Sequence, residues 1–175
     1  MPAELTDGVV TLRPWVESDA AEIVECVDGD ADIMIWLDQV PQPYALDDAL
    51  AFIDGTAVEQ ETYAVTDADS GRVLGSIGMG PVADGVCEIG YWIRADARGR
   101  GAAARALELL AHAALAREGV DRVQLRADVE NAPSCRVAEK AGFTREGVLR
   151  SAHWNARLGR RQDWALYSLL PADLE

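Results

Sequence analysis

The chain has 175 residues, of which 49% are apolar and 26% are charged, so it is long enough for one domain with a buried core and too short for two ordinary ones. Its formal net charge of −14 argues against broad binding to nucleic acid or to an anionic membrane surface. The same charge is compatible with a cationic acceptor such as an amine, although a solvated acidic surface is the simpler explanation.

Hydrophobic periodicity predicts strands and helices along the whole chain. In chain order the expected elements are a strand over 9–15, a helix over 18–27, a helical turn over 33–37, a helix over 46–60, strands over 62–66, 72–79 and 87–93, a helix to about 118, a strand over 123–129, a helix from 131, and strands over 143–153 and 161–169. Ser18 is the expected N-cap of the first helix, and Gly55 weakens the second one locally. This order predicts a mixed α/β single domain over residues 1–175.

The turn at residues 94–101 carries the candidate binding chemistry. It leads from a strand into an alanine- and leucine-rich helix, whose first amides and positive dipole end suit a phosphate group. Glycines in the turn let the backbone approach such a ligand closely. Residues 94–105 also hold four arginines and one aspartate, a local charge of +3 in an acidic chain. This basic island suggests an anionic ligand.

Spacing alone offers a dinucleotide-binding interpretation of the same turn. Gly99 to Ala104 matches a relaxed G-x-G-x-x-A pattern, and Asp121 follows ~20 residues later. That motif should open its helix directly after a strand, whereas residues 94–98 intervene here, and Asp121 precedes its strand instead of ending it. No G-x-x-x-x-G-K-[ST] pattern occurs in the sequence, so a P-loop is not indicated either.

Three motifs, in the right order, resemble those of the GNAT superfamily of acyl-CoA-dependent N-acetyltransferases. Arg98-x-x-Gly101-x-Ala103 matches the R/Q-x-x-G-x-G/A signature, and residues 131–143 resemble the run N-x-x-S-x-x-V-x-x-K-x-G-F. The segment EIGYW at 88–92 looks like the fourth strand of the ribosomal-protein N-terminal (RimJ/RimL-like) branch. The resemblance covers essentially the whole chain. It implies a central, mostly antiparallel twisted sheet of about seven strands, with splayed fourth and fifth strands and about four flanking helices.

This resemblance implies that acetyl-CoA binds in the cleft between the splayed strands. The backbone that would hold its pyrophosphate consists of Arg98, Gly99, Arg100, Gly101, Ala102, Ala103 and Ala104. Trp92 and Ile93 would pair with the pantetheine arm. Asn131 would hydrogen-bond that arm or simply cap the next helix. Arg136 and Lys140 would reach the 3′-phosphate or face solvent.

Acetyl transfer to an amine requires a base for the amine, a donor for the carbonyl oxygen and a proton for the leaving thiolate. The resemblance implies direct attack in a ternary complex, with Ser134 protonating the sulfur; an ordinary helix-start hydroxyl is the alternative. Glu88 is one candidate base, because alternation places it on the strand face opposite Ile89 and Tyr91, or else it is a surface carboxylate. His153 is the other, since a histidine with an ordinary pKa of about 6.5 can act as a base, or else it packs in a hairpin.

The expected function is therefore transfer of an acetyl group from acetyl-CoA to a primary amine, either a protein N-terminus or a small molecule. A non-catalytic acyl-CoA-binding sensor is the alternative, because it would keep the loop and lose only the base. A hydrolase built on Ser134 or Cys135 with His153 lacks the G-x-S-x-G elbow. Four tryptophans line an acceptor cleft or pack in the core: Trp36, Trp92, Trp154 and Trp164.

The remaining composition bounds the cellular setting. Three cysteines at unrelated spacings, Cys26, Cys87 and Cys135, indicate neither a disulfide framework nor a zinc site, so we expect no metal. The first eight residues resemble no secretion signal, and no apolar run approaches the ~20 residues of a membrane helix. We therefore expect a cytoplasmic protein without a membrane or nucleic-acid partner. The sequence leaves a homodimer open.

Overall fold

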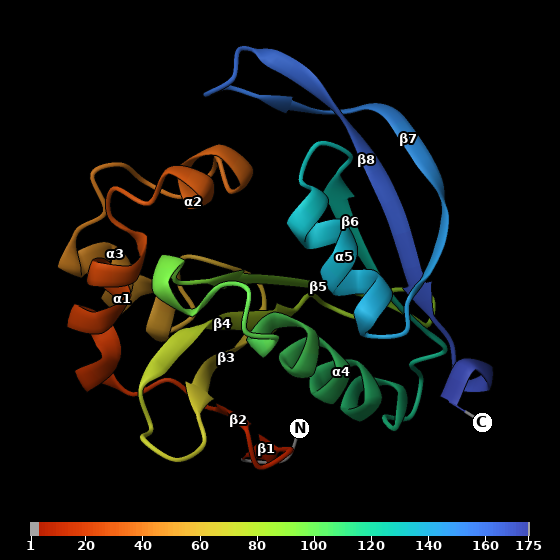
Figure 1. Ribbon diagram of the computed structural model, residues 1–175, viewed down its shortest axis with the longest axis horizontal. Coiled ribbons are helices and arrows are strands. Elements are labelled where there is room, and N and C mark those ends of the chain that lie inside the picture. The colour runs from red at the N-terminus through yellow and green to blue at the C-terminus, as the bar shows by residue number, and fades with distance from the viewer. Residues whose placement is uncertain (1–3, 175) are drawn as a thin grey trace.

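The strands form one sheet, and helices pack on both of its faces (Figure 1). The computed structural model describes residues 4–174. The strands are β1 Leu5–Thr6, β2 Val10–Arg13, β3 Glu61–Asp67, β4 Val73–Met79, β5 Val86–Ile93, β6 Arg122–Asp128, β7 Thr144–Asn155 and β8 Arg160–Leu169. Their order across the sheet is β1-β2-β3-β4-β5-β6-β8-β7, and each neighbouring pair is antiparallel except β5 and β6, which run parallel.

Five α-helices accompany the sheet within the described residues. They are α1 Ala20–Val27, α2 Ala31–Trp36, α3 Leu46–Ile53, α4 Ala102–Leu115 and α5 Ala132–Lys140, with short 3-10 turns η1 Glu17–Asp19, η2 Ala95–Ala97 and η3 Pro171–Leu174. The predicted mixed α/β fold with a mostly antiparallel sheet is confirmed. The sheet has eight strands instead of about seven because the two-residue β1 was not predicted, and the turn expected at 33–37 is the helix α2.

The predicted N-cap of the first helix is wrong. Ser18 lies inside the turn η1, and α1 begins two residues later, at Ala20. The carboxylate of Asp19 accepts a hydrogen bond from the Val16 amide at 3.0 Å and pairs with Arg13 at 2.7 Å. Asp19 therefore satisfies the Val16 amide ahead of the 3-10 turn, and no side chain caps α1 itself.

The helix α3 ends at Ile53, seven residues before the predicted end at residue 60. Gly55 has a φ of +81°, a left-handed conformation that cannot continue a right-handed helix. Gly55 was predicted to weaken this helix locally, but the helix ends before it. The helix α4 likewise ends three residues early, at Leu115 instead of 118.

Successive side chains of the central strands point to opposite faces of the sheet and pack into two separate apolar clusters. In β3, Tyr63 and Val65 belong to the cluster under α4 and α5, whereas Ala64 belongs to the cluster under α1 and α3. The helix α4 contributes Leu107 and Leu110, both fully buried, to the first cluster. The core therefore holds α4 and its N-terminus in a fixed position relative to β5. Within residues 4–174, no helix combines the length and the apolar character that crossing a membrane requires.

The strands β5 and β6 separate after a short paired segment. Their parallel ladder joins Val86–Glu88 to Arg122–Gln124 and then stops, although β5 continues to Ile93 and β6 to Asp128. The predicted splay between the fourth and fifth strands is therefore confirmed, with these strands being β5 and β6. The unpaired ends of the two strands create an opening in the middle of the sheet.

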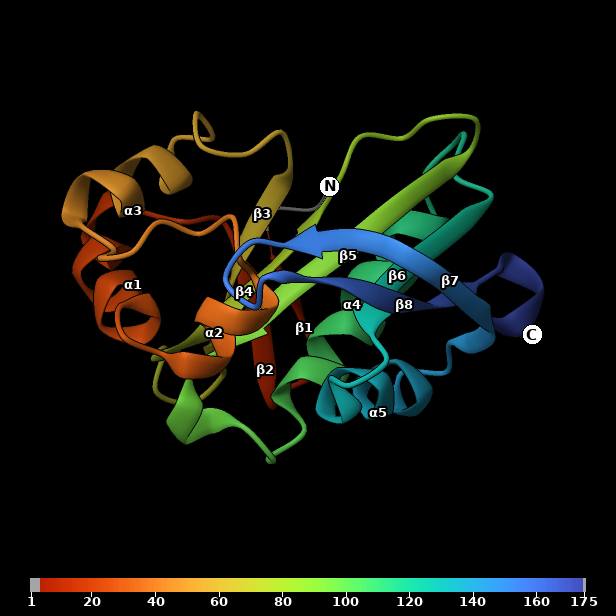
Figure 2. The ribbon, with the colours of Figure 1, turned by 90° about the horizontal axis from the view of Figure 1, so that it is seen from above.

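The β7–β8 hairpin extends from the α5 side of this opening toward α2, as both views show (Figures 1 and 2). Its tip is tied to the chain around α2 by hydrogen bonds. The side-chain amide of Asn155 donates to the Ile35 carbonyl at 2.7 Å, and Arg157 donates to the carbonyls of Met34 and Val40. The opening is thus bordered by the hairpin, α2, α4 and α5.

Candidate active site

The splay between β5 and β6 opens into a cavity of about 640 Å³. Residues 88–93 and 125–128 of the two strands form part of its wall. Every predicted site residue except Arg100 lines it: Glu88, Trp92, Ile93, Arg98, Gly99, Gly101, Ala102, Ala103, Ala104, Asn131, Ser134, Arg136, Lys140 and His153. Segments that are up to 65 residues apart in the sequence (88 and 153) therefore meet around one space.

The N-terminus of α4 offers unpaired amides to this cavity. The first helical hydrogen bond runs from the Arg105 amide to the Gly101 carbonyl at 3.2 Å, so the amides of residues 102–104 have no partner within the helix. Gly101 is the N-cap, with a φ of +86°, and no side chain caps the helix. A Cβ built on Gly101 would meet no atom within 4 Å. This end of α4 therefore presents free amides and the positive end of the helix dipole to the cavity, and both features favour an anionic group.

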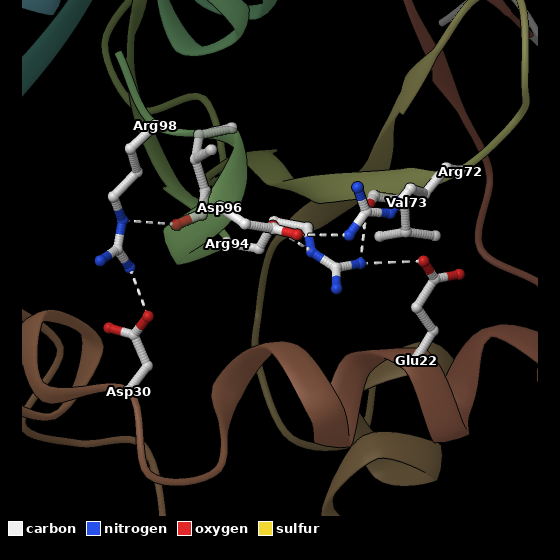
Figure 3. Close-up of polar contacts among 8 residues, drawn as sticks. Glu22, Asp30, Arg72, Val73, Arg94, Asp96 and Arg98 are labelled. Carbon is white, nitrogen blue, oxygen red and sulfur yellow. Dashed lines mark hydrogen bonds and ion pairs between the residues drawn. The ribbon is translucent and has the colours of Figure 1, made fainter. Parts of the chain in front are cut away.

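The side chain of Arg98 holds the loop before α4 in place (Figure 3). Its guanidinium donates to the Ile93 carbonyl at 2.9 Å, to Asp30 at 2.7 Å and to Asp32 at 2.8 Å. The carboxylate of Asp30 also accepts a hydrogen bond from the Ile33 amide, as the N-cap of α2. Arg98 thus connects the loop to β5 and α2, and its side chain is engaged by carboxylates.

The other arginines of this segment are also paired. Arg94 donates to Glu22 and Asp96 at 3.0 and 2.8 Å (Figure 3), and Arg105 binds Asp7 at 2.6 Å. Arg100 has an exposed side chain that forms no ion pair within residues 4–174 and does not line the cavity. Carboxylates therefore neutralise three of the four guanidinium groups at 94–105. The prediction that these arginines attract an anion by their net positive charge is wrong. The observation that favours an anionic ligand here is instead the set of free main-chain amides at residues 102–104.

A pair of hydroxyl groups lies where α5 faces β5. Asn131 caps α5 by accepting a hydrogen bond from the Ser134 amide at 3.2 Å. This places the Ser134 hydroxyl 2.9 Å from the hydroxyl of Tyr91 on β5. Burial raises the pKa of Tyr91 to about 12, despite the opposing effect of the Ser134 hydrogen bond, so this phenol is protonated at neutral pH. The pair can deliver a proton into the cavity.

Glu88 is engaged in an ion pair. Its carboxylate accepts hydrogen bonds from the Arg126 guanidinium at 2.9 Å and from the side-chain amide of Gln124 at 3.2 Å. The Arg126 guanidinium also lies 4.7 Å from the centre of the Trp164 ring. An incoming amine would therefore compete with Arg126 and Gln124 for this carboxylate.

His153 lies on the opposite wall, in contact with a second carboxylate. Its Nε2 is 3.0 Å from Oδ1 of Asp38, and its ring stacks on Trp164 with centroids 5.0 Å apart. The other oxygen of Asp38 accepts a hydrogen bond from the Ala156 amide at 3.1 Å. A carboxylate on one ring nitrogen fixes the ring and leaves the other nitrogen free to accept a proton. No hydrogen bond joins His153 to Ser134 within the described residues, so the two do not form a nucleophile–base pair.

The remaining predicted residues divide by exposure. Arg136 and Lys140 line the cavity from α5 but are exposed. Of the four tryptophans, Trp36, Trp92 and Trp164 line the cavity, whereas Trp154 is 54% exposed and lies outside it.

The cavity residues that were not predicted from the sequence include four with polar side chains that matter below: Tyr91, Asp38, Asp128 and Gln162. Tyr91 lies within the strand motif, where its alternation with Glu88 assigned it to the apolar face. Asp38 directly follows the predicted apolar turn at 33–37, whereas Asp128 lies inside the strand predicted over 123–129, on its polar face; a polar residue at or near the end of an apolar segment is the local signal that could have identified them.

Comparison with known proteins identifies a sequence relative and solved structures with a similar fold. Over 127 residues the chain is 25% identical to the protein "Uncharacterized N-acetyltransferase p20" of Bacillus licheniformis, covering 70% of both chains. The fold matches the microcin C7 self-immunity acetyltransferase MccE in complex with acetyl-CoA and AMP, with a TM-score of 0.78, 21% identity and 97% coverage of both chains. It also matches RimL, a ribosomal L7/L12 alpha-N-protein acetyltransferase in complex with coenzyme A, with a TM-score of 0.75, 19% identity and coverage of 93% and 94%.

The two structural matches, at these identities, establish the fold alone. The family assignment comes from the Acetyltransferase (GNAT) domain profile, which matches residues 10–144. This range includes the splayed strands, the N-terminus of α4 and the start of α5. The chain therefore belongs to the GNAT acetyltransferase domain family.

Proposed function

We propose that this protein moves the acetyl group of acetyl-CoA to a primary amine by direct attack in a ternary complex. One observation carries the proposal: a single cavity joins the open N-terminus of α4 to the hydroxyl pair of Ser134 and Tyr91 and to His153. The residues that could bind phosphate, donate a proton and accept a proton thus line one cavity.

The amides of residues 102–104 would hold the pyrophosphate of acetyl-CoA. The unpaired edge of β5 at Trp92 and Ile93 would accompany the pantetheine arm, and Asn131 would contact that arm with the part of its amide that does not cap α5. Arg136 and Lys140 are the candidates for the 3′-phosphate because they are the exposed cations at the α5 wall. When bound, acetyl-CoA supplies the activated acyl group and the thiolate leaving group.

His153 would remove the proton that keeps an acceptor ammonium from attacking. Asp38 would hold the ring, so that the nitrogen remote from Asp38 accepts this proton. The Ser134 and Tyr91 hydroxyls would supply a proton to the departing thiolate. On the motifs at 88–92 and 131–143 we also place the protein in the ribosomal-protein N-terminal branch of the family, and we propose a cytoplasmic location.

Thiol release from acetyl-CoA tests the proposal across a panel of peptides with free N-termini, amino acids, polyamines and aminoglycosides. Release that depends on one class of amine, with the acetylated amine found by mass spectrometry, is the expected result. Acetyl-CoA binding without release for any amine would favour the sensor, and cleavage of a chromogenic ester would favour a hydrolase.

Ser134→Ala is expected to lower turnover about 10- to 100-fold while acetyl-CoA affinity changes little, because the lost hydroxyl acts on the leaving thiolate. Tyr91→Phe should have a similar effect, and the double variant should lose little more, since the two hydroxyls form one hydrogen-bonded unit. Turnover by thiol release and affinity by calorimetry separate the two quantities. Tyr167→Phe is the control, a buried tyrosine outside the cavity. Turnover of Ser134→Ala equal to that of the parent would remove Ser134 from the mechanism.

His153→Gln is expected to lower turnover about 100-fold across the pH–rate profile, because the glutamine amide cannot accept the proton of the acceptor ammonium. The alkaline side should stay flat to about pH 11, since the pKa of Tyr91 is raised to about 12 and its phenol remains protonated below that value. His112→Gln, on the exposed side of α4, is the control. If Glu88→Gln lowers turnover about 100-fold and His153→Gln does not, Glu88 is the base.

A further inference from the structure

One carboxylate of the cavity has an oxygen without a hydrogen-bond partner. Asp128 is the last residue of β6, lines the cavity and is only 6% exposed. Its Oδ1 accepts a hydrogen bond from the Glu130 amide at 2.7 Å, whereas its buried Oδ2 has no partner within residues 4–174. A buried carboxylate oxygen without a donor is costly in free energy. A ligand that brings a donor into the cavity would remove this cost.

The other carboxylates of the cavity are already satisfied. Glu88 is paired with Arg126, and Asp38 contacts His153. Asp32 is paired with Arg98. The cation nearest to Asp128 along β6 is Arg126, which points to Glu88 instead. Asp128 is therefore the carboxylate that is available to an incoming cation.

A hydrogen-bond donor without a partner lies on the same wall. Gln162, on β8, lines the cavity and is 3% exposed. Its Oε1 accepts a hydrogen bond from Asn155 at 3.4 Å, while its Nε2 is buried and has no partner within the described residues. Within the described residues, the cavity wall thus holds a buried side-chain acceptor without a partner, at Asp128, and a buried side-chain donor without a partner, at Gln162.

The sheet register places these two groups close together. Asp128 lies opposite Trp164 in the β6–β8 ladder, and Gln162 precedes Trp164 by two residues, so all three share one face. Diagonal neighbours of this kind are about 7–8 Å apart. Gln162 also lies opposite His153, which stacks on Trp164. The free acceptor and the free donor therefore lie beside the candidate base.

We propose that Asp128 and Gln162 form the subsite for the acceptor amine, and that the acceptor carries a neutral oxygen three bonds from its nitrogen, as an amino alcohol or an amino amide does. This inference rests on the proposed acetyl transfer. The ammonium donates a hydrogen bond to Oδ2 of Asp128, and the neighbouring oxygen accepts one from Nε2 of Gln162. Once the ammonium has lost its proton to His153, the amine still has N–H groups for Asp128.

Asp128 also contributes to the reaction itself. The nitrogen becomes positively charged again as it bonds to the acetyl carbon, and the carboxylate stabilises this charge more than it stabilises the neutral amine. The hydrogen bond from Gln162 stabilises the bound acceptor and the transition state equally. Gln162 therefore selects the acceptor without accelerating the chemical step.

Ethanolamine and propylamine form a matched pair for the test, because ethanolamine carries a hydroxyl group where propylamine carries a methyl group. Glycinamide carries a carbonyl oxygen at the same distance from the nitrogen. With the parent protein, we expect kcat/KM for ethanolamine and glycinamide to exceed that for propylamine at least tenfold. Gln162→Leu should remove this preference, so that the three amines give similar kcat/KM values. Asp128→Asn should lower kcat/KM about 100-fold for all three amines, with acetyl-CoA affinity by calorimetry unchanged.

Controls separate contact from folding and from general charge. Glu130→Gln removes the same charge two residues away, on an exposed side chain paired with Arg160, and should leave all rates unchanged. Asparagine keeps the acceptor for the Glu130 amide, and Asp128→Glu, which moves the carboxylate by one methylene, provides a second variant with an intermediate loss. Parent-like rates for Asp128→Asn or Asp128→Glu would overturn the role of Asp128 and leave acetyl transfer intact, and equal parent rates for ethanolamine and propylamine would overturn the role of Gln162. A parent that acetylates no amine would overturn both proposals.

Discussion

Gly101→Val is expected to abolish measurable acetyl-CoA binding, with a loss of at least 100-fold in affinity. The residue caps α4 at a φ of +86°, and a Cβ there would project into open space instead of into protein atoms. A valine side chain would occupy the space directly before the free amides of residues 102–104, where the pyrophosphate is proposed to bind. The left-handed conformation adds a cost of about 1–2 kcal/mol to folding, which most domains tolerate.

Gly119→Val is the matched control for this variant. Gly119 follows the other end of α4 with a φ of +82°, and a Cβ there also meets no atom within 4 Å. Its replacement should lower the unfolding temperature by a similar amount and leave acetyl-CoA affinity unchanged. Calorimetric titration of the two folded variants decides the matter. Parent-like affinity in Gly101→Val would show that the coenzyme does not approach this turn.

Arg98→Ala is expected to lower the free energy of unfolding by about 2–3 kcal/mol, somewhat less than the roughly 3–5 kcal/mol for breaking a fully buried ion pair. The variant leaves Asp30, whose side chain is 7% exposed, without its cation, while Arg98 itself is about one-third exposed (32%). The loop before α4 also loses its tie to the Ile93 carbonyl, so acetyl-CoA affinity should fall about tenfold. Denaturant unfolding and calorimetry measure the two effects.

Arg105→Ala serves as the control, because its ion pair with Asp7 is more exposed and such surface pairs contribute about 0–1 kcal/mol. Arg98→Lys keeps the charge but cannot reach the same three acceptors, so it should fall between the parent and Arg98→Ala. Unchanged stability of Arg98→Ala, with affinity lost in a strongly salt-dependent way, would mean that the guanidinium binds the phosphates directly.

The parts of the site that lie in continuous motifs could be predicted from the sequence. The loop at 98–104 and the N-cap Asn131 depend on backbone conformation over a few residues, and glycine, asparagine and proline identify such conformations locally. The splay of β5 and β6 followed from the family resemblance, and the register confirms it. Helix ends were less accurate, because apolar periodicity continues beyond Gly55 while the backbone does not.

The charges of the site could not be assigned in the same way. Arg98 binds Asp30, and His153 binds Asp38, across 68 and 115 residues of sequence. No local pattern shows such pairs, so the arginines of the turn were interpreted as free positive charge. The same limitation concealed Asp128, whose significance comes from an oxygen left without a partner once the other charges are paired.

The most direct test of the central claim is a crystal structure of this protein with acetyl-CoA bound. We expect the diphosphate oxygens to lie within hydrogen-bond distance of the main-chain amides at residues 101–104, and the pantetheine arm to lie between β5 and β6. A diphosphate bound elsewhere, with those amides facing solvent, would contradict the proposed acetyl transfer at this site.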